Sequence, residues 1–248
     1  MRTLKLTLAY DGTNYVGWQR QANGLSVQQV IEDALAPLTG HEKGPSVAGA
    51  SRTDAGVHAR KQVASVNVTF EFETRAVLRA LNVRLPPDVR VLAVDEAPLG
   101  FHARFRSKRK RYQYRIATAA VPSPFDRWFV WHSPEPRDVG AMRHAARAFV
   151  GQHDFASFQA RGSFTVDTIR TLARVDVIEA PGEMLIEVDG NGFLRHMVRA
   201  MVGTLAEVGT GLRDPDSIPG VILRRDRAAA GATAPASGLT LTDVSFSD

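Results

Sequence analysis

Two parts of this chain show a similar order of strand-like and helix-like patterns, and this order constrains the fold more than any other feature. Residues 3–10 alternate apolar and polar side chains, as a half-buried strand does. Ser26 precedes apolar positions spaced three and four apart over about 27–38, which predicts a capped helix. Three elements then complete the first part: a strand over 61–70, a helix capped by Thr74 that runs to Leu85 before Pro86-Pro87, and a strand over 89–97.

The second part gives a similar order. Its expected elements are a strand at 110–118, a helix at about 137–150, strands at 171–180 and 183–190, a helix at about 193–208, a short basic helix at 215–226 and a last strand at 238–246. We therefore predict an α+β protein with two ferredoxin-like (RRM-like) halves, residues 1–105 and 106–248. Their antiparallel sheets are expected to join into one central sheet flanked by helices.

Composition excludes several kinds of chemistry. The chain has no cysteine, which rules out disulfides, thiolate zinc sites and a thiol nucleophile. Its seven histidines lack metal-site spacings, and no Walker-type or GxGxxG loop occurs, so we expect neither a metal nor another cofactor. The apolar runs are far shorter than a bilayer span, and the N-terminus lacks a secretory segment, so a cytoplasmic protein is expected.

The positive charge is concentrated in one segment. The net charge is +5, and seven of the twelve residues of "RFRSKRKRYQYR" (104–115) are basic, with two tyrosines among them. Arginine with tyrosine suits phosphate contact and base stacking, whereas the alternative is a strand edge protected by charge. Strand alternation places Tyr112 and Tyr114 on one face. We favour nucleic-acid binding.

The predicted helix at 193–208 carries two arginines four residues apart. Arg195 and Arg199 would lie at the edge of its apolar face, where their stems could be buried while their charged ends reach a cleft. The alternative is two exposed arginines. His196 is expected on the far face, as a surface residue.

The segment "GASRTDAGVHA" (49–59) places one aspartate among small residues. On general grounds Asp54 is a turn residue that bonds its own backbone. The functional interpretation is that the small neighbours admit a planar substrate, and that Arg52 with Arg199 could keep the carboxylate ionised. An ionised carboxylate suits a nucleophile or base, and no second acidic residue nearby forms a glycosidase-like pair.

Nine ordered segments resemble one family. They are "YDGTNYVGWQRQ", "SVQQVIEDAL", "GASRTDAGVHA", "LPPDVRV", "FHARF", "KRYQYRI", "DFASF", "NGFLRHMVRAMVG" and "AGATAPASGLTLTDVSF", and together they resemble the tRNA pseudouridine synthase A family over essentially the whole chain. The resemblance implies isomerisation of uridine to pseudouridine at positions 38–40 of the tRNA anticodon stem-loop, without cofactor or metal, by a homodimer.

The resemblance also implies site residues. The catalytic residue falls on Asp54, in the first half, and the supporting residues on Arg52, Tyr112, Arg199 and Leu239. Charge alone suggests the phosphate contacts Arg20, Arg104, Arg106, Lys108, Arg109, Lys110, Arg111, Arg224 and Arg225.

The implied reaction requires the uridine to leave the stem, at a cost of a few kcal/mol. Arg52 suits the vacated space, and Tyr112 can stack on the base. Attack of Asp54 on C1′, addition to C6 and abstraction of the 2′ proton all stay open. Two other functions stay open as well, a non-catalytic RNA-binding protein or tRNA chaperone, and a synthase acting on ribosomal or another RNA.

Overall fold

The computed structural model describes residues 1–163 and 165–247 and divides the chain into two compact units. Unit 1 comprises Met1–Lys108 together with the segment from Leu241 on, and unit 2 comprises Arg109–Thr240. The division lies close to the boundary expected after residue 105. The last strand, expected in the second half, contributes residues to both units.

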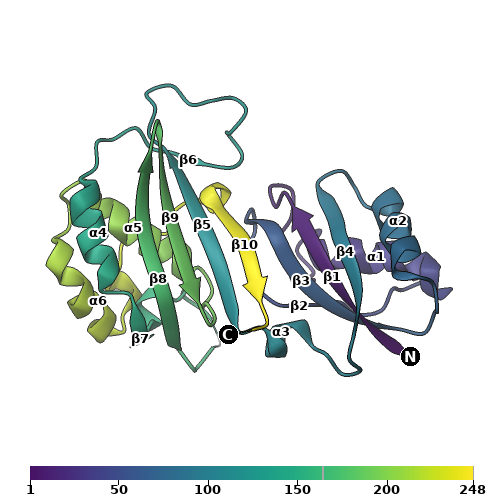
Figure 1. Cartoon of the computed structure of the whole chain (residues 1–248). Helices are drawn as coiled ribbons and strands as arrows, with labels where there is room; N and C mark the ends of the chain where they lie inside the picture. Colours follow the sequence, from purple (N-terminus) through teal and green to yellow (C-terminus); the bar gives the residue numbers. More distant parts are fainter. Residues whose placement is uncertain (164, 248) are drawn as a thin grey trace. The chain divides into compact units, whose positions relative to one another are not determined.

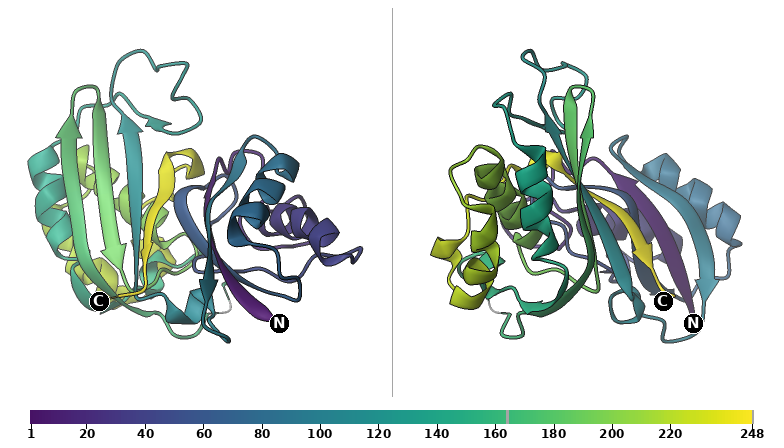
Figure 2. Two further views of the ribbon diagram at one scale, coloured as in Figure 1. Left: turned by 45° about the vertical axis from the view of Figure 1, so that its right-hand side comes forward. Right: turned by 60° about the vertical axis from the view of Figure 1, so that its left-hand side comes forward.

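Unit 1 is an antiparallel sheet with two main helices (Figure 1). Its elements are β1 (Arg2–Tyr10), α1 (Val27–Thr39), β2 (Ala48–Gly49), β3 (His58–Val68), α2 (Thr74–Arg84), β4 (Val89–Ala97), α3 (Ala103–Arg106) and β10 (Leu239–Ser245). The strands follow the order β4-β1-β3-β10, and β2 pairs with β3. Figure 2 shows α1 and α2 on the same face of this sheet.

Local sequence explains most of unit 1. The even positions of β1 from Leu4 to Tyr10 are buried, as their alternation predicts, and α1 buries Val27, Ile31 and Leu35 in the same core. Ser26 caps α1, because its hydroxyl accepts the backbone N–H of Gln29 at 3.2 Å. The cap expected at Thr74 is wrong: the N-cap of α2 is Glu73, and its side chain makes no capping bond.

Unit 2 is also a sheet covered by helices. Its elements are β5 (Arg109–Ala117), β6 (Trp131–His132), α4 (Val139–Arg147), β7 (Gly151–Asp154), β8 (Ile169–Ala180), β9 (Glu183–Gly190), α5 (Met197–Gly209) and α6 (Ile218–Arg224), with 3-10 turns at 156–158, 215–217, 227–229 and 236–238. The strands run antiparallel in the order β5-β9-β8-β7, and β6 pairs with β5 in parallel. Helices α4, α5 and α6 lie on one face (Figure 2).

Helix α5 forms the centre of the unit 2 core, because all but two of its residues are buried. It begins at Met197 rather than at about 193, since His196 adopts a left-handed backbone with φ 62°. Arg195 therefore precedes the helix, and the expectation that Arg195 and Arg199 share one helical edge is wrong. Half-buried His196 is the N-cap residue rather than a residue of the far helix face.

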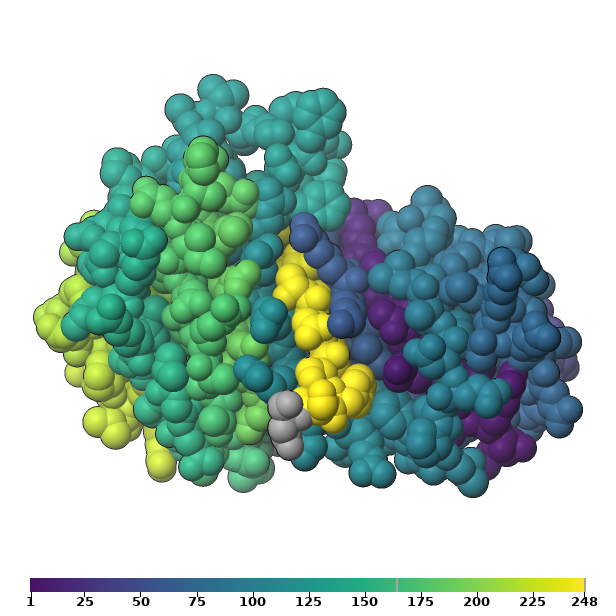
Figure 3. Space-filling model, viewed as in Figure 1, coloured from purple at the N-terminus to yellow at the C-terminus, as the bar shows by residue number. Residues whose placement is uncertain are grey.

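The segment between β5 and β6 projects beyond the strands of unit 2 and exposes Val121, Phe125 and Trp128 (Figures 1 and 3). Within residues 1–163 and 165–247, no helix has the length and apolar character needed to cross a membrane. The α+β class, with large antiparallel sheets flanked by helices, is confirmed.

Candidate active site

Asp54 lies on the loop between β2 and β3, which we call the Asp54 loop (residues 50–57). The segment between β1 and α1 holds this loop through its backbone: Trp18 N–H donates to the carbonyl of Thr53 at 3.0 Å, and Gly56 N–H donates to the carbonyl of Tyr15 at 3.3 Å. Within the loop, Val57 N–H donates to the carbonyl of Asp54 at 3.1 Å. Several independent bonds therefore fix the backbone around the carboxylate.

Side chains from the sheet support the same loop. The hydroxyls of Tyr10 and Thr53 are 2.8 Å apart, and Gln62 on β3 donates to the carbonyl of Ser51 at 2.7 Å. Burial raises the pKa of Tyr10 to about 12, against the opposing effect of its bonds to Thr53 and Gln62. The phenol is therefore neutral and available as a hydrogen-bond partner near neutral pH.

Glycines allow the close approach of the two segments. A Cβ on Gly12 would lie 2.0 Å from the carbonyl oxygen of Val57, and one on Gly49 would lie 2.4 Å from the Trp18 ring. Gly56 has φ 77°, a conformation that favours glycine. These small residues are needed for packing and for the turn, a reason that the sequence alone did not reveal.

Asp54 is half-buried, whereas Arg52 is exposed. The side chain of Arg52 makes no hydrogen bond or ion pair with any residue that the structure describes, so it does not pair with Asp54 as the sequence suggested it could. Desolvation lowers the pKa of Arg52, and the positive charge of Arg104 lowers it further. Arg52 thus carries a charge that no carboxylate of the described residues neutralises.

His58 is buried at the start of β3. Its Nδ1 lies 3.0 Å from the backbone nitrogen of Gly12 and 3.0 Å from a carboxylate oxygen of Asp11. These contacts join the start of β3 to the segment before α1. They give His58 a packing role next to the Asp54 loop.

In unit 2, the tyrosines of β5 face inward. Tyr112 is 4% exposed and packs edge-to-face on Phe193, with ring centroids 5.1 Å apart. The hydroxyl of Tyr114 donates to the carbonyl of Pro235 at 2.7 Å, and burial raises its pKa strongly. Tyr112 and Tyr114 thus share one face, as alternation predicted.

Arg199 lies in the first turn of α5 and is fixed by the linker loop (residues 230–235). Its Nε donates to the carbonyl of Ala234 at 2.7 Å, and Ala234 N–H donates back to the Arg199 carbonyl at 3.1 Å. The loop is itself held, because Thr204 accepts from Gly231 N–H at 2.9 Å and Glu207 accepts from Ala232 N–H at 3.1 Å. Leu239 is buried at the first position of β10 and belongs to unit 2.

Several of the expected phosphate contacts make intramolecular bonds. Asp189 on β9 accepts from Arg109 at 3.2 Å and from Arg111 at 3.1 Å, while buried Lys110 donates to the carbonyl of Asn191 at 3.3 Å. The acidic residues of β9, Glu183, Glu187 and Asp189, share one face of the strand, and this pattern could have predicted partners for the arginines of β5.

The remaining expected contacts divide into two groups. Arg20 pairs with Glu32 at 3.0 Å, and Arg225 pairs with Asp154 at 2.9 Å. The other side chains are exposed: Arg104, Arg106, Lys108 and Arg224. In the described ranges, no group of three or more His, Cys, Asp or Glu residues is placed to hold a metal ion.

A carboxylate on a loop whose backbone is fixed, with an unneutralised arginine two residues away, points to an enzyme that acts on a nucleic acid. Sequence comparison specifies the class. The model of a family described as tRNA pseudouridine synthase matches residues 7–106 and 145–247, and the chain belongs to this family.

Individual relatives extend the match to nearly the full chain. A tRNA pseudouridine synthase A of Geobacter sulfurreducens is 47% identical over 249 residues, covering 99% of this chain and 100% of the relative. Those of Pelobacter propionicus and Geotalea uraniireducens are 45% and 44% identical, with the same coverage. A solved chain from a Cbf5-Nop10-Gar1 complex covers 96% of this chain and 48% of its own length, at 12% identity and a TM-score of 0.41, a likeness too low to support a conclusion.

Proposed function

We propose that this protein isomerises uridine to pseudouridine at positions 38–40 of the tRNA anticodon stem-loop, with Asp54 as the catalytic residue. Family membership makes it an isomerase that acts on tRNA. The positions are those implied by the resemblance to the A-type synthases. The observation that carries the proposal is the 47% identity, over nearly the full length, to a relative of that name. It is supported by the position of Asp54 on a loop whose backbone is bonded to the segment between β1 and α1.

The supporting residues divide by what each can do. Arg52 is exposed and unneutralised, which suits a group that enters an RNA stem and contacts phosphate while the uridine is extruded. Tyr112, Arg199 and Leu239 support the active site. Arg199 suits this role because the linker loop fixes its guanidinium through Ala234, so little conformational entropy is lost when it binds.

The sharpest test is Asp54→Ala. We expect the variant to bind an unmodified tRNA transcript as the wild type does and to form no pseudouridine detectable by nucleoside chromatography. Glu42→Ala is the matched control, because it removes an exposed carboxylate of the same unit and should leave product formation unchanged. Appreciable turnover by Asp54→Ala would remove Asp54 from the catalytic role.

The positions require a separate measurement. Transcripts in which only residue 38, 39 or 40 is uridine should each acquire pseudouridine, whereas a transcript with cytidine at all three should acquire none in that region. Product elsewhere in the tRNA, or on isolated ribosomal RNA but not on tRNA, would contradict the assignment of the substrate.

We also propose that the protein is a homodimer, as the family resemblance implies, and that it is cytoplasmic, as the sequence predicts. Light scattering coupled to size-exclusion chromatography should then give twice the chain mass of 27.1 kDa. A mass of one chain at micromolar concentration would contradict the dimer.

A further inference from the structure

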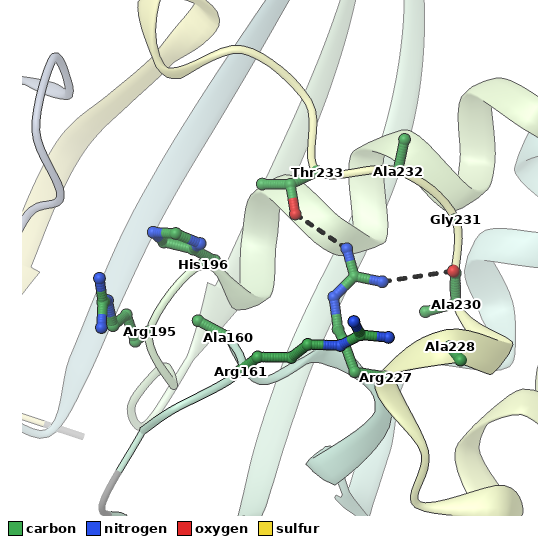
Figure 4. Close-up of a pocket in the computed structure, with 10 residues that line it drawn as sticks. All are labelled: Ala160, Arg161, Arg195, His196, Arg227, Ala228, Ala230, Gly231, Ala232 and Thr233. Carbon is green, nitrogen blue, oxygen red and sulfur yellow. Dashed lines mark hydrogen bonds between the residues drawn. The ribbon is translucent and has the colours of Figure 1, made fainter.

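Unit 2 contains a pocket of about 480 Å³ whose polar side chains are mostly basic (Figure 4). Three segments form its walls: residues 160–161, residues 195–196 before α5, and residues 227–228 with 230–233. Arg161, Arg195 and Arg227 contribute its positive charge, and no aspartate or glutamate lines it. This cluster is not visible in the sequence, because the three arginines are distant along the chain.

The charge in the pocket is largely uncompensated. The side chains of Arg161 and Arg195 have no hydrogen-bond or ion-pair partner in the part of the chain that the structure describes. By contrast, Arg109 and Arg111 of the same unit are paired with Asp189. Figure 4 shows that Arg161 lies next to Arg227 and that Arg195 lies across the pocket, beyond His196. Three guanidinium groups lining one pocket that no carboxylate lines favour an anionic ligand.

Arg227 is the fixed member of the cluster. Its guanidinium donates to the hydroxyl of Thr233 at 2.8 Å and to the carbonyl of Ala230 at 3.3 Å. Desolvation lowers its pKa, the charge of Arg161 lowers it further, and Glu207 acts in the opposite direction. Figure 4 shows the side chain of Arg161 extending toward that of Arg227. An anion between them would relieve this repulsion.

The backbone adds to the same preference. His196, which lines the pocket, is the N-cap residue of the 13-residue helix α5, and its side chain makes no capping hydrogen bond. The N-terminus of a helix carries partial positive charge and N–H groups that suit a phosphate. Ala160 N–H donates to the carbonyl of Arg195 at 2.9 Å, so two walls of the pocket are bonded to each other.

We propose that this pocket binds a backbone phosphate of the RNA substrate, with the exposed side chains of Arg161 and Arg195 and the fixed side chain of Arg227 as its contacts. Arginine's planar fork matches phosphate oxygens in a bidentate way. An RNA phosphate is favoured over a free one because the pocket wall at Thr233 continues directly into Ala234, whose carbonyl holds Arg199. The inference rests on the proposed function, since it assigns the anion to the same substrate.

The test measures binding rather than catalysis. An unmodified tRNA transcript is titrated with the full-length protein at several salt concentrations. The Arg161→Ala/Arg195→Ala variant should bind about tenfold more weakly than the wild type. Its slope of log affinity against log salt should fall in magnitude by about 0.7 to 0.9 for each phosphate that the variant no longer neutralises. Arg147→Ala is the control, because it removes an exposed arginine of the same unit that does not line the pocket.

A second variant separates charge from geometry. Arg161→Lys/Arg195→Lys keeps both charges and should retain most of the salt slope while losing part of the affinity. Equal affinity and slope for the double-alanine variant and Arg147→Ala would overturn the proposal. A second result would also overturn it. If calorimetry shows that the wild type binds inorganic phosphate and the double-alanine variant does not, while both bind tRNA equally, then the pocket takes a free anion rather than an RNA phosphate.

The two proposals fail in different ways. If the wild type binds tRNA but makes no pseudouridine, the proposed function is wrong, whereas the pocket is still judged by the affinities and salt slopes. If the wild type makes pseudouridine and the double-alanine variant binds tRNA as the control does, only the pocket assignment is wrong.

Discussion

Replacing Gly12 with alanine tests whether the Asp54 loop depends on the close approach of the segment before α1. The new Cβ would lie 2.0 Å from the carbonyl oxygen of Val57 and 2.6 Å from its carbonyl carbon. Both atoms belong to the backbone, so rotation of a side chain cannot relieve the overlap. The backbone of residues 12 and 57 must therefore separate, which also displaces the neighbouring Asp54.

The cost follows from two contributions. Overpacking of this kind costs about 1–3 kcal/mol. Separation of the segments also lengthens the 3.0 Å contact between the Gly12 nitrogen and Nδ1 of His58, a loss of about 1 kcal/mol if that bond breaks. The sum is about 2–4 kcal/mol, which corresponds to a decrease in Tm of roughly 5–15 °C for a chain of this size.

Thermal melting followed by circular dichroism measures the effect on stability, and single-turnover formation of pseudouridine measures the displacement of Asp54. Gly220→Ala is the matched control, because its Cβ would meet nothing within 4 Å and alanine favours the helix α6 in which it lies. We expect the control to melt at or slightly above the wild-type temperature. If Gly12→Ala melts as the control does, the close approach does not hold the loop and the reasoning is refuted.

Three further predictions concern other contacts. Gly203→Ala places a Cβ 1.7 Å from the carbonyl oxygen of Ala232 and should destabilise the protein by about 1–3 kcal/mol in urea unfolding; an unchanged midpoint would contradict the close packing of α5 on the linker loop. Tyr114→Phe leaves the Pro235 carbonyl without its 2.7 Å donor, so the free energy of unfolding in urea should fall by about 1–3 kcal/mol. An unchanged free energy of unfolding would show that water replaces the hydroxyl and would contradict the prediction. Because burial raises the pKa of Tyr10 from 10.0 to about 12, its contribution to stability is complete below pH 10 and is lost as the pH rises toward 12. Between about pH 9 and 11, the free energy of unfolding should decline less steeply with pH for Tyr10→Phe than for the wild type. Equal slopes for the two proteins would refute the raised pKa of Tyr10.

Much of the fold was predictable because its determinants are local. The alternation of β1, the apolar stripe of α1 and the Ser26 cap each depend on residues that are close together in the sequence. The two-residue strands β2 and β6 were not predictable, since a pattern of two residues has no period. Nor was the start of α5, which depends on the left-handed backbone of His196.

The candidate site, like the fold, was predictable from the sequence only in part. The segments that mark the family indicate a candidate catalytic residue and candidate supporting residues without a structure. Sequence could not tell which arginines have carboxylate partners. Arg109 and Arg111 meet Asp189 only because β5 and β9 pair in a particular register, across about eighty residues of chain.

By itself, the sequence determined the class of elements, their order, the absence of thiol chemistry and the family. Tertiary structure decided which glycines hold the Asp54 loop, which basic side chains are already neutralised, and that Arg161, Arg195 and Arg227 line one pocket. The physical reason is one of distance along the chain. Periodicity and capping act between near neighbours, whereas close approach, ion pairing and clustering of charge join residues that only the folded chain brings together.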